Sequence, residues 1–194
     1  MFRHRCETEK ETSNEDDFCD EVVKVSGTDI FFYSGVNSSS VSKLNFVLRK
    51  LEKELLIKAI EYPGYEPRIN IYIKSEGGDI FEGFSAMDHI ENTKLHVTTI
   101  ADGCCASAAT FMFLAGHTRE MNQHAFLLIH QISMDGIWGK YEEIKQEVQN
   151  SDKFMETIKN IYREKTKIPT KKLDEFMKKD VYLSAHDCTK YGII

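Results

Sequence analysis

The sequence lacks any pair of cysteines at C-x-x-C spacing, although cysteine itself is not rare. Cysteine occurs at five positions, namely Cys6, Cys19, Cys104, Cys105 and Cys188. Their number is odd and their spacing matches no zinc-ligand pattern, so neither a disulfide framework nor a structural zinc site is indicated. We therefore expect free thiols in a reducing compartment.

Basic residues are outnumbered, since 25 lysines and arginines face 31 aspartates and glutamates and the formal net charge is −6. Phosphate backbones are bound through clustered Lys and Arg, so no nucleic-acid partner is expected. No apolar run reaches the roughly 18–20 residues of a membrane span. The first stretch, MFRHRCETEKETSNEDDF, lacks the apolar core of a secretory signal. These absences predict a cytoplasmic protein with no membrane partner.

Two functional motifs are also missing. The residues two before and two after Ser107 are Cys105 and Ala109, so the G-x-S-x-G elbow of the α/β-hydrolases is absent. No G-K-[ST] follows the glycine pair Gly77–Gly78, and Asp79 beside it would repel a phosphate. The chain therefore carries no nucleotide motif of its own, and neither a cofactor nor a metal is predicted.

What is present is the pattern of one globular domain. The 194 residues are 41% hydrophobic, which is enough for a sizeable core. Residues 1–20 are polar and acidic and predict a flexible tail, and residues 21–194 form the domain. The spacing of apolar residues predicts strands at 21–36 (two runs broken by Gly27), 68–75, 94–103 and 124–133, and helices at 38–62, 76–93, 107–116, 139–168 and 169–180, with a last helical turn. This alternation predicts an α/β fold.

The helix ends carry recognisable signals. Ser38 to Ser40 are candidate N-caps for the helix at 38–62, whose apolar face is expected to run as far as Ile60. Gly116 is the expected C-terminal cap of the apolar helix at 107–116. Pro169 is expected to end the long charged helix that precedes it.

Ser107 has two interpretations. It stands where the small residues of ADGCCA give way to an apolar run, and its position alone favours a helix N-cap. A serine at the start of a helix can also be a nucleophile if a base removes its proton, because the unpaired N–H groups there face any oxyanion that forms.

Three other features are individually weak. His130 ends an apolar strand and is either a hydrogen-bonded core histidine or a strand-end group in a cleft. Asp180 follows a predicted helix and is either a cap, a solvated turn acid or a functional carboxylate. The Gly77–Gly78 pair is an ordinary tight turn or a point of close backbone approach.

Taken in order, these features make the chain resemble the ClpP family of self-compartmentalising serine proteases. The resemblance covers about residues 21–194 and rests on SEGG (75–78), GCCAS (103–107), IHQ (129–131), DVYLSA (180–185) and YG (191–192). It implies the ClpP/crotonase-type spiral of repeated β-β-α units.

The same resemblance assigns roles to residues. Ser107 matches the nucleophile, His130 the general base and acid, and Asp180 the carboxylate that orients the imidazole. The backbone N–H groups of Gly78 and Ala108 match the oxyanion hole. The implied activity is hydrolysis of unfolded polypeptides to short peptides.

The resemblance also implies an assembly. Protomers of the family form heptameric rings, and two rings stack as a tetradecamer through a segment that corresponds here to 132–165. An ATP-driven AAA+ unfoldase is the implied partner, and it would be the component that uses ATP. The chain departs from the family at four positions, which are Glu76, Ala108, Ala109 and Ile132, and its acidic tail does not match the family's gating hairpin.

Three alternatives stay open. The chain could be a non-catalytic ring subunit, an enoyl-CoA-type enzyme on the same fold, or a Ser–Lys peptidase, although the sequence singles out no lysine for Ser107. The adjacent Cys104 and Cys105 are either small buried thiols or a redox-sensitive pair beside the nucleophile.

Overall fold

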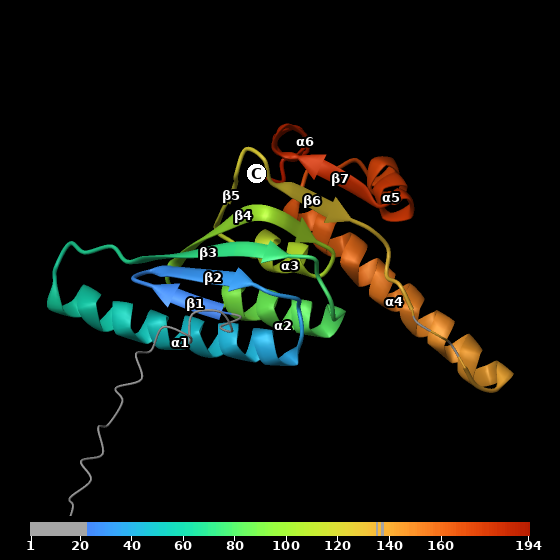
Figure 1. The fold of residues 1–194 in the computed structure, drawn as a ribbon, viewed down its shortest axis with the longest axis horizontal. Coiled ribbons are helices and arrows are strands. Elements are labelled where there is room, and N and C mark those ends of the chain that lie inside the picture. The colour runs from blue at the N-terminus through green and yellow to red at the C-terminus, as the bar shows by residue number, and fades with distance from the viewer. Residues whose placement is uncertain (1–22, 135, 137) are drawn as a thin grey trace, which may run out of the picture.

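The computed structural model describes residues 23–134, 136 and 138–194. The tail expected at 1–20, together with Cys6 and Cys19, lies outside the described residues. Within the described part, strands and helices alternate along the chain, which confirms the α/β prediction (Figure 1).

Seven strands in the described part of the chain form one sheet. Their bounds are β1 Val23–Ser26, β2 Asp29–Tyr33, β3 Arg68–Ser75, β4 His96–Ala106, β5 Thr118–Met121, β6 Phe126–Ile129 and β7 Val181–Ser184. The sheet order is β1-β2-β3-β4-β6-β7, with β5 also paired to β4. The predicted break at Gly27 is confirmed, because β1 and β2 form an antiparallel hairpin around this residue at φ 61°. The central strands from β2 to β6 pair in parallel, and β7 runs antiparallel to β6.

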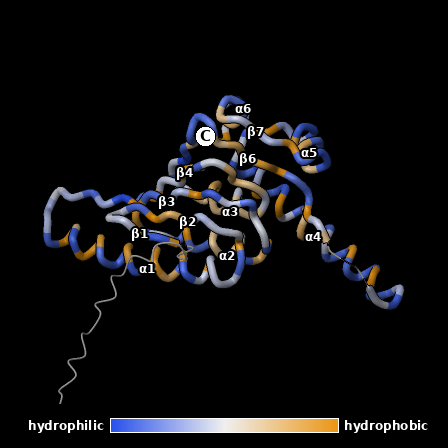
Figure 2. Tube along the Cα trace, viewed as in Figure 1, coloured by the Kyte–Doolittle hydropathy of each residue, from blue (hydrophilic) through white to orange (hydrophobic). Residues whose placement is uncertain are grey.

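Six helices accompany the sheet in the described residues. They are α1 Ser38–Glu61, α2 Ile80–Glu91, α3 Ala109–Leu114, α4 Tyr141–Lys165, α5 Thr170–Lys179 and α6 Ala185–Lys190. The helices α1, α2 and α3 lie along one face of the sheet, and one end of α4 projects away from the body (Figure 1). The core fills the space between that face and the helices, and its fully buried members include Phe32, Leu44, Ile71, Phe113 and Leu127. Hydrophilic and hydrophobic residues alternate along the projecting part of α4 (Figure 2).

The long strand β4 changes neighbours part of the way along. Its first part, Thr98–Ala101, pairs with β5, and its last part, Cys104–Ala106, pairs with β6. Gly103 lies between the two parts at φ 95°, a conformation that favours glycine. This change brings the end of β4, and the residue after it, beside β6.

Two predictions about the helix α1 are wrong. The N-cap of α1 is Asn37, whose side chain accepts from the backbone N–H of Ser40 at 3.0 Å, while Ser40 Oγ accepts from Asn37 N at 3.1 Å. This reciprocal pair satisfies two orphan donors at once, so the serines at 38–40 are already helical. At the other end the buried face stops at Leu55, and Ile60 is 82% exposed.

The structure requires a glycine at position 116 for a reason other than capping. The apolar helix is shorter than expected, with Ala115 as its C-cap residue, and Gly116 does not have a positive φ. A Cβ at Gly116 would lie 2.2 Å from Thr99 Oγ1, so the glycine permits close packing against β4. The strand β5, in the polar stretch TREM, was not predicted.

Candidate functional site

The sheet topology brings the site residues predicted from the sequence to one end of the sheet, where the parallel strands finish. The strands β3, β4 and β6 are parallel, so their carboxyl ends lie at the same edge, and Gly78, Ser107 and His130 follow those ends. Asp180 immediately precedes β7, which is antiparallel to β6, so it lies at this edge as well. Ligand and catalytic sites of open α/β sheets are commonly found at such an edge.

Ser107 occupies a sharp turn between β4 and α3. Its φ is 55°, an uncommon value for a residue with a side chain. Its N–H donates to Leu128 O at 3.0 Å, and a Cβ added to Gly77 would lie 2.6 Å from its own Cβ, so the turn is held tightly on both sides. The helix begins only at Ala109, after Ala108, and no side chain caps it. The N-cap interpretation of Ser107 is therefore wrong.

Two residues that sequence reasoning missed support this turn. Thr110 Oγ1 donates to Ser107 O at 2.6 Å, and Tyr162 of α4 hydrogen-bonds to the same Oγ1. The single hydroxyl proton of Thr110 is used by Ser107, so Tyr162 is the donor to Thr110. Burial raises the pKa of Tyr162 and keeps its phenol protonated. The signal in the sequence was a lone threonine inside an apolar run.

His130 and Asp180 face each other at ion-pair distance. His130 Nδ1 lies 3.9 Å from Asp180 Oδ1, which is longer than a hydrogen bond. The imidazole is 23% exposed and the carboxylate 72% exposed. Asp180 caps the C-terminus of α5 in a left-handed conformation, with φ 48°. The predicted His130–Asp180 contact is thus present in a loose form.

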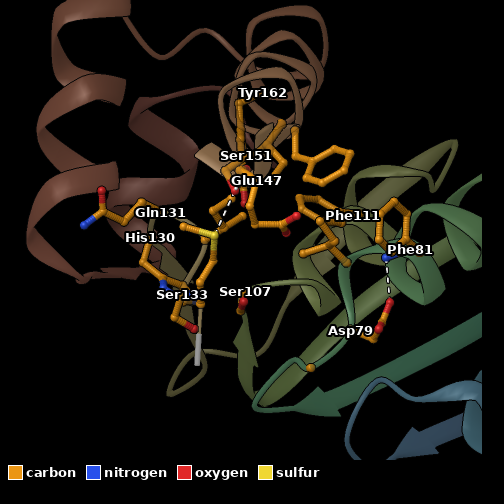
Figure 3. A pocket seen from close by; sticks show the side chains of 16 residues that line it. Asp79, Phe81, Ser107, Phe111, His130, Gln131, Ser133, Glu147, Ser151 and Tyr162 are labelled. Atoms are coloured by element: carbon orange, nitrogen blue, oxygen red, sulfur yellow. Dashed lines mark hydrogen bonds between the residues drawn. The ribbon is translucent and has the colours of Figure 1, made fainter. Parts of the chain in front are cut away.

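Ser107 and His130 line the same pocket, but no hydrogen bond joins their side chains in the described residues. Figure 3 shows the two groups on neighbouring walls of this pocket. Hydrogen bonds between catalytic groups are often long in unliganded enzymes and tighten when substrate binds.

Two backbone N–H groups beside Ser107 are unused. Neither Gly78 nor Ala108 donates a hydrogen bond to another described residue. Gly78 is held at φ 148°, and a Cβ there would lie 2.2 Å from Val36 O, so a side chain does not fit. Ala108 N is near the same turn, because a Cβ on Gly77 would lie 3.2 Å from it. The site thus contains two main-chain donors without an internal acceptor.

The pocket has a volume of about 290 Å³ and mixed walls. Its apolar walls come from α2, α3, α4 and the segment after β6, and include Phe81, Phe111, Ile132, Phe154 and Ile158. Its polar lining includes Asp79, Ser133, Glu147 and Ser151, several of which Figure 3 labels. Of these, Asp79 is the N-cap of α2, and its Oδ1 accepts from Phe81 N at 2.8 Å.

The adjacent cysteines do not line this pocket. Cys105 is buried, and burial raises its pKa. Cys104 is partly exposed, and burial followed by the hydrogen bond from its Sγ to Glu76 Oε2 at 3.5 Å raises its pKa to about 11. Cys188 is also buried, and all three are free thiols. The buried-thiol interpretation holds for Cys105 and in part for Cys104.

Two kinds of feature are absent from the described residues. None of the helices that they form has the length and apolar character needed to cross a membrane. They contain no group of three or more His, Cys, Asp or Glu side chains arranged to hold a metal ion.

Comparison with known proteins bears on this site as a whole. The chain is 31% identical over 158 residues to an ATP-dependent Clp protease proteolytic subunit of Oltmannsiellopsis viridis, covering 77% of this chain and 80% of that protein. It is 32% identical over 145 residues to proteolytic subunit 2 of Borreliella burgdorferi, covering 74% and 71%. A match to the subunit of Deinococcus radiodurans, at 29% identity, spans 64% of that protein's length.

The fold has a solved relative. A ClpP1 mutant from Listeria monocytogenes superimposes with a TM-score of 0.73 over 87% of this chain and 89% of that one, at 23% identity. This likeness concerns the fold alone and confirms the predicted ClpP-type fold. A sequence profile of the family described as Clp protease matches residues 25–194. The chain therefore belongs to the Clp protease family.

Proposed function

We propose that this protein is a serine endopeptidase that cleaves unfolded polypeptides, with Ser107 as nucleophile, His130 as base and Asp180 as orienting carboxylate. The observation that carries the proposal is the strained Ser107 turn, which lies in one pocket with His130 and beside two unused N–H groups. A serine that merely capped α3 would need neither the left-handed conformation nor the free donors.

The acylation step follows from these positions. Ser107 Oγ attacks the carbonyl carbon of the scissile bond while His130 accepts the hydroxyl proton. The N–H groups of Gly78 and Ala108 donate to the resulting oxyanion. Collapse of this intermediate breaks the C–N bond, and the imidazolium gives its proton to the leaving amine. The product is an ester between Ser107 and the N-terminal part of the substrate.

Deacylation reverses the roles. A water molecule attacks the ester carbonyl while His130 takes one of its protons, and the same two N–H groups stabilise the second oxyanion. Breaking of the ester bond returns the proton to Ser107 Oγ. Asp180 stabilises the imidazolium in both steps, and its 3.9 Å separation from His130 must shorten for this contact to reach hydrogen-bond length.

We further propose that the chain works as a homo-oligomer of heptameric rings stacked through residues 132–165, with an AAA+ unfoldase as a partner. The support for stacking is the exposed first half of α4, where Tyr141, Ile144 and Val148 are all solvent-accessible. Large apolar side chains gathered on a projecting helix mark a surface that is buried in an assembly. The flexible acidic tail predicted at 1–20 is not part of this assembly proposal.

The proposal is tested by peptide hydrolysis with the purified chain. Wild-type protein is expected to cleave unfolded casein or a fluorogenic peptide, and Ser107→Ala and His130→Ala to lower kcat by about 10⁴- to 10⁶-fold. Hydrolysis by the chain alone would exclude a non-catalytic ring subunit. Undiminished hydrolysis by the Ser107→Ala variant would refute the assignment of the nucleophile, and hydrolysis of an acyl-CoA thioester in place of peptides would favour the enoyl-CoA-type alternative.

A further inference from the structure

We propose that Glu147 makes this peptidase prefer lysine or arginine at the substrate residue whose carbonyl Ser107 attacks. The inference rests on the proposed function and concerns the pocket that adjoins Ser107. In serine peptidases, the pocket beside the nucleophile receives the side chain of that residue and sets the preference for it.

The walls of the pocket suit a long unbranched side chain. Phe111 of α3 and Phe154 and Ile158 of α4 line it, and Phe111 and Ile158 are buried. Such walls accept the methylene groups of lysine and arginine, which bury their stems against apolar surface while the charged head stays near polar groups. These walls by themselves would accept leucine, methionine or norleucine equally well.

The charges around the pocket are of one sign. Among the described residues, its lining contains the carboxylates of Asp79 and Glu147 and no lysine or arginine. Oδ1 of Asp79 is engaged at the start of α2, where it accepts from Phe81 N and Glu82 N at 2.8 and 3.1 Å. Glu147 differs, because its carboxylate has no hydrogen bond or ion pair with any residue that the structure describes. The side chain of Ser151 does reach Glu147, but at its main-chain oxygen, which accepts from Ser151 Oγ.

The position of Glu147 places that free carboxylate above the nucleophile. Figure 3 shows Glu147 and Ser151 on α4 and Ser107 on the opposite side of the same pocket. A substrate side chain that enters beside Ser107 and follows the apolar walls therefore meets Glu147 at its far end. A cationic head group there gains a charge-assisted contact, an uncharged one gains nothing, and an acidic one is repelled.

The test uses four fluorogenic peptides that differ only at the residue before the scissile bond, which is lysine, arginine, norleucine or glutamate. Norleucine is the matched control because it has an unbranched aliphatic stem without the charge. We expect kcat/KM of the wild type to be about tenfold higher for lysine and arginine than for norleucine, and lowest for glutamate. Raising the salt concentration is expected to shrink this ratio.

Two variants of α4 locate the effect. Glu147→Gln is expected to lower the lysine-to-norleucine ratio of kcat/KM about tenfold, to near one. Glu142→Gln removes the same charge from an exposed position of the same helix that does not line the pocket, and is expected to keep the wild-type ratio. Glu147→Lys is expected to invert the order, so that the glutamate peptide is cleaved faster than the lysine peptide.

The outcomes separate the inference from the function on which it rests. Equal rates for lysine and norleucine in the wild type, or an unchanged ratio in Glu147→Gln, would overturn the role of Glu147 and leave the peptidase assignment intact. If no peptide is cleaved, or if Ser107→Ala cleaves all four like the wild type, the proposed function itself fails.

Discussion

The two halves of α4 lie in different surroundings, although they belong to one continuous helix (Figure 1). In the second half, Ile158 and Tyr162 are buried, and Tyr162 contacts Phe111 and Thr110 of α3. In the first half, every side chain from Tyr141 to Gln149 is exposed, including Ile144 and Val148. Just before the helix, Trp138 is 90% exposed.

This difference shows that contacts within a single chain account for the residues in the second half of α4 but not for the apolar residues in the first half. The second half forms most of the α4 wall of the Ser107 pocket, to which the first half adds Glu147, and it hydrogen-bonds to Thr110, so its sequence serves the fold and the site. The apolar residues of the first half contact nothing comparable within the described chain. They have a physical explanation only if another copy covers them, as ring stacking would do.

The largest effect is expected from charging the exposed half. The double substitution Ile144→Asp and Val148→Asp places two carboxylates in the proposed contact between rings, where burial without partners is costly. We expect the particle mass to fall by half, from a stacked pair to a single ring, in native mass spectrometry. The circular dichroism spectrum is expected to stay unchanged, since both positions are exposed in the single chain.

A wild-type protein that is monomeric, or a double variant that keeps the full particle mass, would contradict a stacking role for the first half of α4. A matched double substitution on another exposed helix surface, Ile57→Asp with Ile60→Asp in α1, serves as the control. It adds the same charge outside residues 132–165 and is expected to keep the stacked particle.

The next largest effect concerns the packed half. This is measured in the Ile144→Asp, Val148→Asp double variant, so that ring stacking does not contribute. In it, Ile158→Ala is expected to lower the free energy of unfolding by about 2–4 kcal/mol, because a side chain only 3% exposed is truncated. Tyr141→Ala, at an exposed position, is expected to change it by less than about 0.5 kcal/mol. Chemical denaturation measures both, and similar losses for the two variants would contradict the contrast.

A smaller effect is expected from the hydroxyl groups that join α4 to the nucleophile turn. Thr110→Val removes the hydroxyl donor to Ser107 O, to which the backbone N–H of Thr110 still donates, and leaves the buried Tyr162 hydroxyl without its acceptor, at a cost of about 1–3 kcal/mol. Tyr162→Phe is expected to cost only about 1 kcal/mol in the wild type. In the Thr110→Val background, Tyr162→Phe is expected to cost nothing or to stabilise, because it removes the unpaired group. Additive losses in this double-mutant cycle would show that the two hydroxyls are not coupled.

The smallest effect involves ion pairs on the two halves. Lys159 Nζ of the packed half lies 2.8 Å from Asp174 Oδ1 of α5, and this hydrogen bond holds the pKa of Asp174 below its ordinary value of 3.8. A lowered carboxyl pKa stabilises the fold above the unfolded-state pKa, and the contribution is lost as pH falls through the folded-state value. Asp174→Asn is therefore expected to lower Tm slightly at pH 7, and by less at a pH well below 3.8.

Glu142 supplies the comparison on the exposed half. Its ion pair with Lys145 spans 3.8 Å within one helix at the surface, so Glu142→Gln is expected to leave Tm unchanged at either pH. A larger pH-dependent shift for Glu142→Gln than for Asp174→Asn would reverse the expected order of the two halves.

The fold was predictable where a repeating pattern of apolar residues fixes an element. The alternation in RINIYIKS predicts β3 with its observed bounds, and the helical spacing from Val41 to Leu55 predicts the buried face of α1. The strand β5 was missed because TREM is short, polar and paired only with β4. Gly116 was assigned to a cap because its actual constraint, the nearness of Thr99, is a contact between distant positions in the chain.

The site was less accessible to local patterns. Asp180 is one of 31 acidic residues, and its nearness to His130 depends on the pairing of β6 with β7. Position alone favoured Ser107 as a cap, and only the left-handed turn excludes this. Tertiary packing brings Tyr162 to Thr110 and Glu147 to the pocket of Ser107, and it leaves no mark on local periodicity. The ordered set of family motifs predicts the candidate site residues because it encodes this long-range arrangement indirectly.

The central proposal is that Ser107 is an activated nucleophile, and a fluorophosphonate probe tests it most directly. Wild-type protein is incubated with the probe and digested, and the modified peptide is located by mass spectrometry. We expect one adduct per chain on Ser107, with labelling lost in Ser107→Ala and slowed at least about a hundredfold in His130→Ala. Absence of an adduct on Ser107 in the folded, assembled wild type, or equal labelling in His130→Ala, would contradict a nucleophile activated by His130.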